Sequence, residues 1–350
     1  MKTIKVPASK TYDVVIGAGL HKELDSYIPS LTKASKAAII SDSNVWPLYG
    51  TVAEESLQNA GLDICSYVFP AGEASKNGEN YLAILNFLAQ QHITRSDVLI
   101  ALGGGVVGDI TGFAAATYLR GISYIQIPTT LLAMVDSSVG GKTAIDLPAG
   151  KNLAGAFYQP SLVLCDIDAL KTLPDSIFRD GCAEIIKYGI LYDADLFEHL
   201  YAHGLDFDRE TVVGRCVELK RDVVAEDEFD KGARQKLNLG HTIGHGIEAN
   251  SNFTVSHGQA VAIGTAIVSK AGCTAGICNT DTYRKILSIL EKFGLPQKTD
   301  ADAHTLYTCA LSDKKRTGGT VNLIIPRKIG DCIIQETPIN ALQSFIEAGL

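Results

Sequence analysis

The pattern of apolar and polar positions changes character near residue 174. Before it, short β-branched runs alternate with stretches of helical apolar spacing. The predicted strands are residues 13–16, 37–41, 66–69, 98–102, 124–128 and 162–165, and the helices between them include 81–91 and 107–119. Because strands that alternate with helices favour a parallel sheet covered on both faces, we expect an α/β domain over residues 1–173.

The remaining residues, 174–350, contain long segments with an apolar residue every three to four positions. The predicted helices include residues 176–203, 209–225, 237–249 and 259–278, and an alternating stretch at 321–326 predicts a strand paired in a hairpin with 332–335. We therefore expect a mostly helical second domain. Ligands of open α/β sheets bind beyond the carboxyl ends of the strands, so the cleft between the two domains is the expected site.

A glycine-rich loop follows the apolar run at 98–102. Its glycines permit close backbone approach, and the helix that begins there offers free N–H groups to a phosphate. Gly103, Gly105 and Gly108 satisfy G-x-G-x-x-G, but a Rossmann fingerprint belongs to the first strand–helix unit, and several strands precede this loop. The loop therefore favours pyrophosphate binding of another dinucleotide type, or is only a tight turn packed by small residues. Asp109, one turn into the helix, could hold a ribose or a nicotinamide amide.

Polar and charged residues recur at helical spacing in the second domain. They are Glu184 and Lys187, then Arg234, Asn238, His241 and His245 on nearly one stripe of a predicted helix, and His257 further on. Four polar side chains on one face of a core helix indicate something polar to bind. One carboxylate and two imidazoles with an open position form a catalytic zinc pattern. The spacing leaves open which histidines are ligands and which one acts as acid or base.

Basic residues stand beside the glycine-rich segments and recur in the second half. They are Arg120, Lys142, Lys151, Lys187, Lys220, Arg234, Lys314 and Lys315. If the fold brings them to one cleft, they would focus a positive field on a small polyanion such as a phosphorylated sugar acid. The segment 140–143 resembles the end of a Walker loop, but Asp136 stands where that motif requires its first glycine, which excludes an ATPase of this type.

Composition and charge exclude other classes. The 350 residues are 46% apolar and 20% charged, with 31 basic and 39 acidic side chains and a net charge of −8. Without a basic tract, binding to nucleic acid or a membrane surface is not expected. The eight cysteines form no Cys-x-x-Cys pair, and no apolar run has the length of a signal peptide or a membrane span. We expect a cytoplasmic protein with reduced thiols. A homodimer is a separate expectation, which composition and charge do not determine.

Several blocks of sequence together resemble one enzyme family. They are 103–109 (GGGVVGD), 120–122 (RGI), 128–130 (PTT), 136–143 (DSSVGGKT), 150–152 (GKN), 184–188 (EIIKY), 234–248 (RQKLNLGHTIGHGIE), 257–258 (HG) and 313–315 (DKK). The resemblance is to the 3-dehydroquinate synthases, which are sugar-phosphate cyclases, and it covers nearly the whole chain. It implies a lyase of the shikimate pathway of aromatic amino acid biosynthesis that requires NAD and Zn²⁺ or Co²⁺. Such an enzyme converts 3-deoxy-D-arabino-heptulosonate 7-phosphate to 3-dehydroquinate and phosphate by transient oxidation, elimination, re-reduction and intramolecular aldol closure.

The resemblance also assigns roles to residues. The implied metal ligands are Glu184, His241 and His257. The implied NAD contacts are Gly72, Glu73, Lys76, Gly104, Gly105, Val106, Asp109, Thr129, Thr130 and Lys151. The implied substrate contacts are Arg120, Lys142, Asn152, Lys187, Lys220, Arg234, Asn238, His245 and one of Lys314 and Lys315. His245 would transfer protons beside the metal, and Lys142, Arg234 and Asn238 would complete the catalytic set.

Three alternatives remain at this point. The chain could be a related cyclase, such as a 2-deoxy-scyllo-inosose or 2-epi-5-epi-valiolone synthase. It could be a metal-dependent alcohol or glycerol dehydrogenase, which would release NADH with every turnover instead of recycling it. A metal-stabilised binding protein is the non-enzymatic alternative, but a hydride-competent NAD site would have no purpose there. Gln259, Asp146 and Tyr158 depart from the usual residues of the resembled family, which affects only the surroundings of the site.

Overall fold

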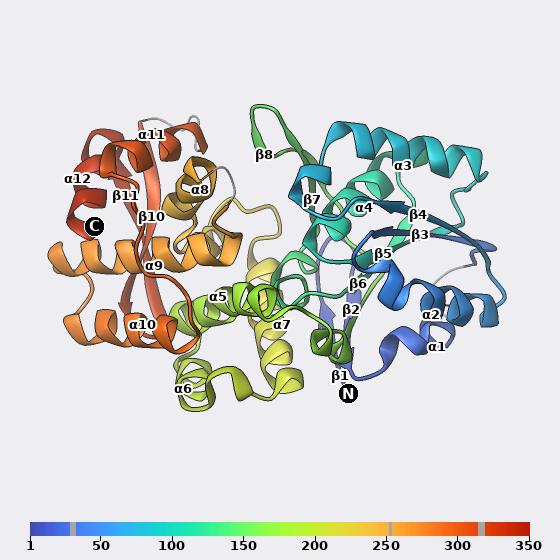
Figure 1. Cartoon of the computed structure of the whole chain (residues 1–350), viewed down its shortest axis with the longest axis horizontal. Helices are drawn as coiled ribbons and strands as arrows, with labels where there is room; N and C mark the ends of the chain where they lie inside the picture. The colour runs from blue at the N-terminus through green and yellow to red at the C-terminus, as the bar shows by residue number, and fades with distance from the viewer. Residues whose placement is uncertain (29–32, 252–253, 314–318) are drawn as a thin grey trace. The chain divides into compact units, whose positions relative to one another are not determined.

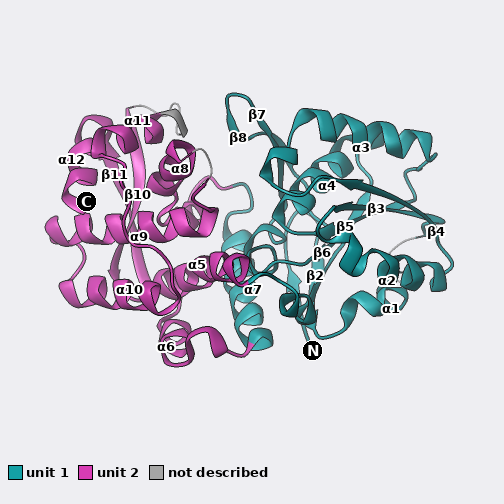
Figure 2. Ribbon diagram, in the orientation of Figure 1, with its two compact units in different colours: residues 1–174, 209–229 teal, residues 175–208, 230–350 magenta. Residues whose placement is uncertain are grey.

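The computed structural model describes residues 1–28, 33–251, 254–313 and 319–350. This part of the chain divides into two compact units (Figure 2). Unit 1 comprises Met1–Pro174 and Arg209–Phe229, and unit 2 comprises Asp175–Asp208 and Asp230–Leu350. The first change of unit falls one residue from the boundary predicted at 173. Arg209–Phe229, which the sequence analysis placed in the second domain, belongs instead to unit 1.

Unit 1 is built on a seven-stranded sheet in the order β1-β2-β9-β6-β5-β3-β4 (Figure 1). Its strands are β1 (Lys2–Val6), β2 (Tyr12–Gly17), β3 (Lys36–Asp42), β4 (Asp63–Phe69), β5 (Val98–Gly103), β6 (Ser123–Pro128) and β9 (Leu162–Asp166). β1 runs antiparallel to β2, and the other neighbouring pairs are parallel. The six predicted strands and the parallel sheet are confirmed, whereas β1 was not predicted.

Helices complete unit 1. They are α1 (Leu24–Tyr27), α2 (Trp46–Asn59), α3 (Gly78–Gln90), α4 (Gly105–Thr117) and α7 (Arg209–Glu226), with short helical turns η1 (Leu20–Lys22), η2 (Glu73–Ser75), η3 (Tyr118–Arg120), η4 (Ala133–Ser137) and η5 (Ile167–Lys171). α3 and α4 share one apolar cluster with buried side chains of β3 and β5, such as Ile40 and Leu99. α7 packs against β1, β2 and η4, which explains why this helix belongs to unit 1.

A two-stranded antiparallel hairpin in unit 1 was not predicted. It consists of β7 (Lys142–Leu147) and β8 (Gly150–Phe157). Small residues let its strands approach closely, because a Cβ on Gly155 would lie 2.1 Å from the carbonyl oxygen of Thr143. Such residues give a weak strand pattern in the sequence, since β propensity depends mainly on β-branched and aromatic side chains.

Unit 2 is mostly helical, as expected. Its helices are α5 (Asp175–Tyr192), α6 (Ala194–His203), α8 (His241–Asn250), α9 (His257–Thr274), α10 (Thr280–Lys292), α11 (Ala303–Asp313) and α12 (Ile339–Gly349), with the turns η6 (Gly204–Asp206) and η7 (Ala233–Asn238) and the strands β10 (Thr320–Lys328) and β11 (Asp331–Pro338). β10 and β11 form the predicted hairpin, in which Ile325 pairs with Ile333. Apolar residues of α8, α9, α11, α12 and this hairpin form one buried core.

Two predicted helices of unit 2 are interrupted. The segment 176–203 divides into α5 and α6 at Asp193, whose carboxylate accepts a hydrogen bond from the N–H of Leu196 (2.9 Å) and so caps α6. The segment from Arg234 to His245 is also not one helix. η7 ends at Asn238, Gly240 adopts φ = +77°, and α8 begins only at His241. The prediction that Arg234 and Asn238 share a helical stripe with the histidines is therefore wrong.

Among the described residues, no helix combines the length and the apolar character that crossing a bilayer would require.

Candidate metal centre and nucleotide site

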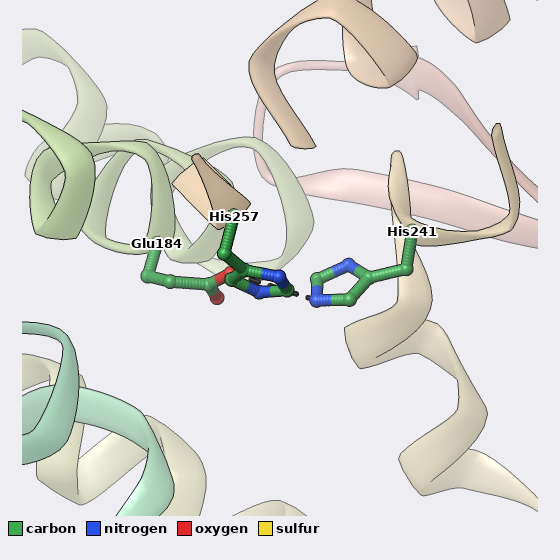
Figure 3. Close-up of side chains that lie close together, drawn as sticks. All are labelled: Glu184, His241 and His257. Atoms are coloured by element: carbon green, nitrogen blue, oxygen red, sulfur yellow. Dashed lines mark ion pairs between the residues drawn. The ribbon is translucent and has the colours of Figure 1, made fainter. Parts of the chain in front are cut away.

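Three helices of unit 2 bring one carboxylate and two imidazoles together (Figure 3). Glu184 lies in α5, and His241 and His257 are the first residues of α8 and α9. Oε1 of Glu184 lies 3.6 Å from Nε2 of His241 and 3.5 Å from Nε2 of His257. One ligand atom from each residue lies within 4.8 Å of the other two. The convergence of these three side chains agrees with the expected ligand set.

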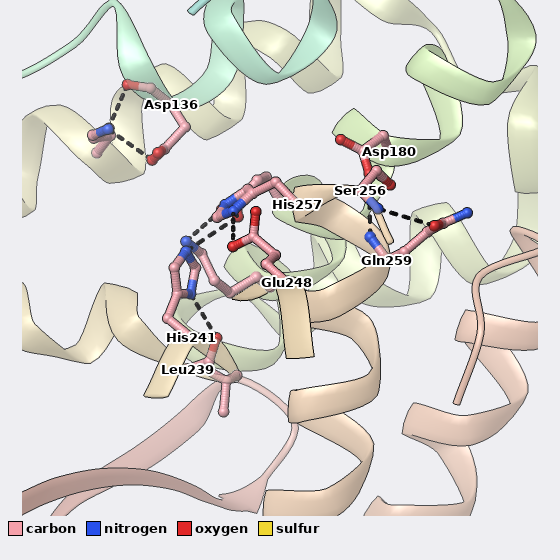
Figure 4. A network of polar contacts seen from close by, with 11 residues as sticks. Asp136, Asp180, Leu239, His241, Glu248, Ser256, His257 and Gln259 are labelled. Carbon is pink, nitrogen blue, oxygen red and sulfur yellow. Dashed lines mark hydrogen bonds and ion pairs between the residues drawn. The ribbon is translucent and has the colours of Figure 1, made fainter. Parts of the chain in front are cut away.

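These separations fit a zinc ion. Tetrahedral ligands at ordinary zinc bond lengths lie roughly 3.3 Å apart, close to the two distances above. Nδ1 of His241 lies 3.0 Å from the carbonyl oxygen of Leu239, and Nδ1 of His257 lies 3.3 Å from Oε2 of Glu248 (Figure 4). When each Nδ1 donates to its oxygen, each Nε2 is left as a lone pair for a metal, which is the usual arrangement of histidine ligands. A zinc ion held by these three side chains would have a fourth position open.

The charged neighbours of Glu184, His241 and His257 affect each side chain differently. Oε2 of Glu184 forms an ion pair with Nζ of Lys187 in the same helix, while Oε1 faces the imidazoles. Burial lowers the pKa of His241 well below its usual value, and the nearby Lys187 lowers it further, so that the ring is neutral. Burial alone would also lower the pKa of His257, but hydrogen bonds to Glu184 and Glu248 raise it to about 10. Binding a cation would therefore displace a proton from His257.

Close packing fixes where α8 and α9 begin. A Cβ on Gly264 of α9 would lie 2.1 Å from the carbonyl oxygen of Gly240, so the two helices approach to backbone contact. A Cβ on Gly258 would lie 2.0 Å from the carbonyl oxygen of Asp180 in α5. Ser256 and Gln259 form a capping box at the start of α9, and both donate to Oδ1 of Asp180 (Figure 4). These contacts hold His241 and His257 at facing helix ends.

The other predicted residues of unit 2 lie at different distances from the ligands. The ring of His245 lies 5.5 Å from that of His241 and 6.2 Å from that of His257, between centroids. His245, Glu248 and His257 also form a second group whose ligand atoms lie within 4.8 Å of one another. Arg234 is buried on η7, which packs against α5 and the β10–β11 hairpin. The structure brings His245 beside the three ligands, and it places Arg234 and Asn238 on a separate element.

In unit 1 the glycine loop joins β5 to α4. Packing alone accounts for two of its glycines, because a Cβ on Gly103 would lie 2.5 Å from Val107 and one on Gly108 would lie 2.6 Å from Gln126. At Gly104 and Gly105 the nearest side chains, at 3.0 and 3.1 Å, are those of Thr130 and Ser137. The loop lies beside the point where the strand order reverses, since β3 has β4 on one side and β5 on the other. Such a switch point is where open α/β sheets bind ligands.

Several predicted NAD contacts form a polar network near this loop. Nζ of Lys76, which is buried, lies 2.5 Å from Oδ2 of Asp109 and 2.6 Å from Oδ1 of Asn152. Nζ of Lys151 forms a longer ion pair with Glu73 at 3.7 Å. Burial alone would lower the pKa of Lys76, but Asp109 and Glu73 outweigh it and raise the pKa. The structure thus joins three segments: the turn after β4, the start of α4, and the β7–β8 hairpin.

The remaining predicted residues divide between the units. Thr129 follows β6, and its N–H donates to the carbonyl oxygen of Gly103 at 3.0 Å. Arg120 and Lys142 are exposed on unit 1. Lys220 of α7 is buried and donates to Oδ1 of Asp136 at 2.7 Å. The remaining residues predicted to contact NAD, Gly72 and Val106, belong to unit 1, and Lys187 belongs to unit 2. Lys314 and Lys315 lie outside the described residues.

The sequence analysis missed the residues that orient the ligands. Glu248 was quoted only within a motif, yet its spacing of seven from His241 and three from His245 puts it on their helical face and could have identified it. Asp180 and Ser256 carried no such pattern, because their roles arise from contact between α5 and the start of α9. Asp136, the partner of Lys220, is separated from it by 84 residues and could not be paired from spacing.

Comparison with known proteins places the chain in a family. Residues 66–180 match the family model for the N-terminal domain of 3-dehydroquinate synthase, and residues 181–316 match the model for its C-terminal domain. A 3-dehydroquinate synthase of Enterococcus faecalis is 41% identical over 350 residues, with 98% of both chains covered. One of Clostridium acetobutylicum is 43% identical over 343 residues, with 96% of both chains covered.

Solved structures agree in fold. A 2-epi-5-epi-valiolone synthase from Streptomyces hygroscopicus with NAD⁺ and Zn²⁺ bound has a TM-score of 0.89 and is 27% identical, over 99% of this chain and 97% of that one. An iron-containing alcohol dehydrogenase, at 14% identity over 97% of both chains, has a lower TM-score of 0.68 and shares the fold. Both family models, the near full-length relatives and the site geometry lead to one assignment: the chain belongs to the 3-dehydroquinate synthase family.

Proposed function

We propose that this protein is an NAD-dependent 3-dehydroquinate synthase. It would convert 3-deoxy-D-arabino-heptulosonate 7-phosphate to 3-dehydroquinate and phosphate, with no net oxidation. The observation that carries the proposal is the convergence of Glu184, His241 and His257, each from a different helix, in a chain that matches both domains of this family. The relatives that cover nearly the whole chain carry the same name.

Glu184, His241 and His257 would hold a Zn²⁺ or Co²⁺ ion. A bound ion of this kind polarises a substrate hydroxyl so that its proton leaves more easily. The three side chains supply one negative charge and two neutral nitrogens, and they leave a position for the hydroxyl oxygen. Lys187 would keep the second oxygen of Glu184 engaged, so that this carboxylate binds the ion through one oxygen only.

His245 would hold or move a proton next to the ion. Its ring lies beside both ligand histidines without being required as a ligand.

The cationic side chains would bind the substrate's carboxylate and phosphate, because a doubly charged phosphate needs several opposing charges. They are Arg120, Lys142, Lys187, Lys220 and Arg234, with Asn152 and Asn238 as hydrogen-bonding amides and one of Lys314 and Lys315 as a further cation. Such positioning matters because the later steps need mainly a correctly held substrate.

The loop at Gly104, Gly105 and Val106 would bind the pyrophosphate of NAD at the start of α4. A bound NAD⁺ accepts a hydride and returns it later in the same turnover. Asp109 and Lys76 would hold the polar end of the nucleotide, with Gly72, Glu73, Thr129, Thr130 and Lys151 around them. The valiolone synthase with NAD⁺ and Zn²⁺ bound supports this pair of cofactors, since it is 27% identical and shares the fold.

Cytoplasmic location and assembly as a homodimer are part of the same proposal. All eight cysteines are thiols in the structure, which suits a reducing compartment.

The proposal is tested by measuring phosphate release from the heptulosonate phosphate. We expect release that requires NAD, that stops when a chelator removes the metal, and that returns when Zn²⁺ is added back. Undiminished turnover in a metal-free preparation would contradict the assigned role of Glu184, His241 and His257. Reaction of a different sugar phosphate, with no reaction of the heptulosonate, would assign the protein to a related cyclase.

A further inference from the structure

A strained turn presents Arg120. Leu119, Arg120 and Gly121 have φ angles of +50°, +69° and +117°, three consecutive residues in the left-handed half of the backbone map. For residues other than glycine this conformation is unfavourable, and it persists only where surrounding contacts hold it. Such strain concentrates at functional sites. The turn therefore needs a support that fixes it in this form.

Tyr158, just after β8, is such a support. Its hydroxyl donates to the carbonyl oxygen of Ile122 at 2.8 Å, one residue beyond the strained turn. The hydroxyl oxygen of Tyr158 would lie 3.2 Å from a Cβ on Gly121, so it rests directly against the turn. The Tyr158 ring is stacked on the buried ring of Tyr124, with centroids 5.8 Å apart, and the Tyr124 hydroxyl donates to the carbonyl oxygen of Tyr158 at 2.9 Å. Tyr158 is thus itself held rigidly.

The backbone of Tyr158 also anchors the loop that presents Lys142. Its N–H donates to the carbonyl oxygen of Gly141 at 2.7 Å. Gly140 and Gly141 have φ angles of +96° and +66°, so this loop is another left-handed turn, and it leads directly into Lys142 at the start of β7. Tyr158 therefore contacts both turns. One turn contains the exposed Arg120, and the other is followed directly by the exposed Lys142.

We propose that Tyr158 is a positioning residue that fixes the Arg120 turn against the Lys142 turn, and so sets the spacing of two cations that bind the anionic groups of the substrate. This inference rests on the proposed function, because it requires Arg120 and Lys142 to bind substrate. Tyr158 touches neither substrate nor cofactor in this account. It acts through the two turns.

The test is Tyr158→Phe, which removes only the hydroxyl. In the enzyme loaded with NAD and Zn²⁺, we expect the KM for the heptulosonate phosphate to rise about fivefold, the size expected for one lost hydrogen bond. The kcat and the dissociation constant for NAD should stay within about twofold, because the glycine loop is untouched. Tyr81→Phe is the matched control, since it removes a hydroxyl that contacts Thr117 at 2.7 Å on α4 and leaves both turns intact. It should leave the KM unchanged.

A double-mutant cycle separates positioning from general damage. If Tyr158 acts through Arg120, then Tyr158→Phe should raise the KM much less in an Arg120→Ala background than in the native protein. Gly121→Ala strains the same turn without changing Tyr158 and should reproduce the rise in KM, which keeps the inference testable if the Tyr158 variant does not fold. A large effect of Arg120→Ala with no effect of Tyr158→Phe or Gly121→Ala would overturn the inference and leave the proposed function intact. A native protein that releases no phosphate would instead contradict the proposed function.

Discussion

At the scale of single residues, the site depends on which ring nitrogen each histidine offers. The sequence placed three histidines near one another but could not divide them into ligands and acid or base. In the structure, Nε2 of His241 and Nε2 of His257 converge on Glu184, because their Nδ1 atoms face Leu239 and Glu248. His245, one turn into α8, stands beside them. That division follows from where α8 and α9 begin and from the oxygen atom that each Nδ1 faces, neither of which was predicted from the sequence.

The role of His245 can be tested by replacing it with alanine. We expect His245→Ala to keep about one bound zinc per chain while its turnover falls roughly 10²- to 10⁴-fold, the range for loss of a general acid or base. Metal content is measured by elemental analysis alongside phosphate release. The exposed His304→Ala is the control and should change neither quantity. A His245→Ala protein that arrives without metal would show that the ligand roles are misassigned.

Asp97 is a residue whose contribution to stability should depend on pH. Its carboxylate is buried and accepts hydrogen bonds from the N–H groups of Thr94 (2.7 Å) and Lys36 (2.9 Å), which join the start of β5 to the start of β3. Burial alone would raise the pKa of Asp97, but these hydrogen bonds outweigh it and lower the pKa. A pKa that is lower in the folded state contributes stability above about pH 4, and this stability is lost as the pH falls through the folded value.

We therefore expect Asp97→Asn to reduce the free energy of unfolding by about 1–3 kcal/mol at neutral pH. The difference from the native protein should shrink as the pH falls below about 4 and through the lowered pKa of the folded carboxylate. Denaturant unfolding at several pH values measures it, with the exposed Asp300→Asn as control. A difference that stays constant from neutral to acid pH would rule out the ionised carboxylate as its origin.

At the scale of elements, most strands and helices followed from apolar periodicity, and the interruptions did not. The buried runs of β3 and β5 and the 3.6-residue spacing of α9 are strong patterns. The break between η7 and α8 depends instead on Gly240, which adopts a positive φ. Gly240 also lies against α9, where a Cβ would meet the carbonyl oxygen of Val261 at 2.5 Å. The apolar spacing on both sides of this glycine does not show that the backbone of another helix lies against it. The β7–β8 hairpin was missed for a similar reason, since Gly155 is glycine because the backbone of the neighbouring strand leaves no room for a side chain.

Gly240→Ala should therefore damage the metal centre through the element that carries His241. Gly240 has a φ of +77° and Gly276 a φ of +72°. Replacing either one by alanine should lower the protein's free energy of unfolding by about 1 kcal/mol, because alanine is strained in this conformation. Only Gly240 would also clash, since a Cβ on Gly276 meets nothing within 4 Å. We expect Gly240→Ala to weaken zinc binding at least tenfold in a chelator competition, and Gly276→Ala to leave it unchanged. Equal zinc affinities for the two variants would show that the start of α8 does not set the site.

At the scale of the whole molecule, the division into units follows the chain less simply than the sequence suggested. The first segment of unit 1 ends at Pro174, and the expected domain boundary follows residue 173. α7 has the apolar spacing of a packed helix, but spacing shows only that a face is buried and not which unit buries it. Its contacts with β1 and β2 settle that question. Lys220 therefore lies on a segment of unit 1 that falls between two segments of unit 2 in the sequence.

The central claim is that the protein oxidises and re-reduces its substrate within one turnover. The most direct test follows phosphate release and NADH absorbance together while the heptulosonate phosphate reacts in the presence of NAD⁺ and Zn²⁺. We predict that phosphate accumulates over many turnovers while NADH shows no steady rise, because each hydride taken from the substrate is returned to it. NADH that accumulates one-for-one with product would contradict the account and identify a dehydrogenase on the same fold.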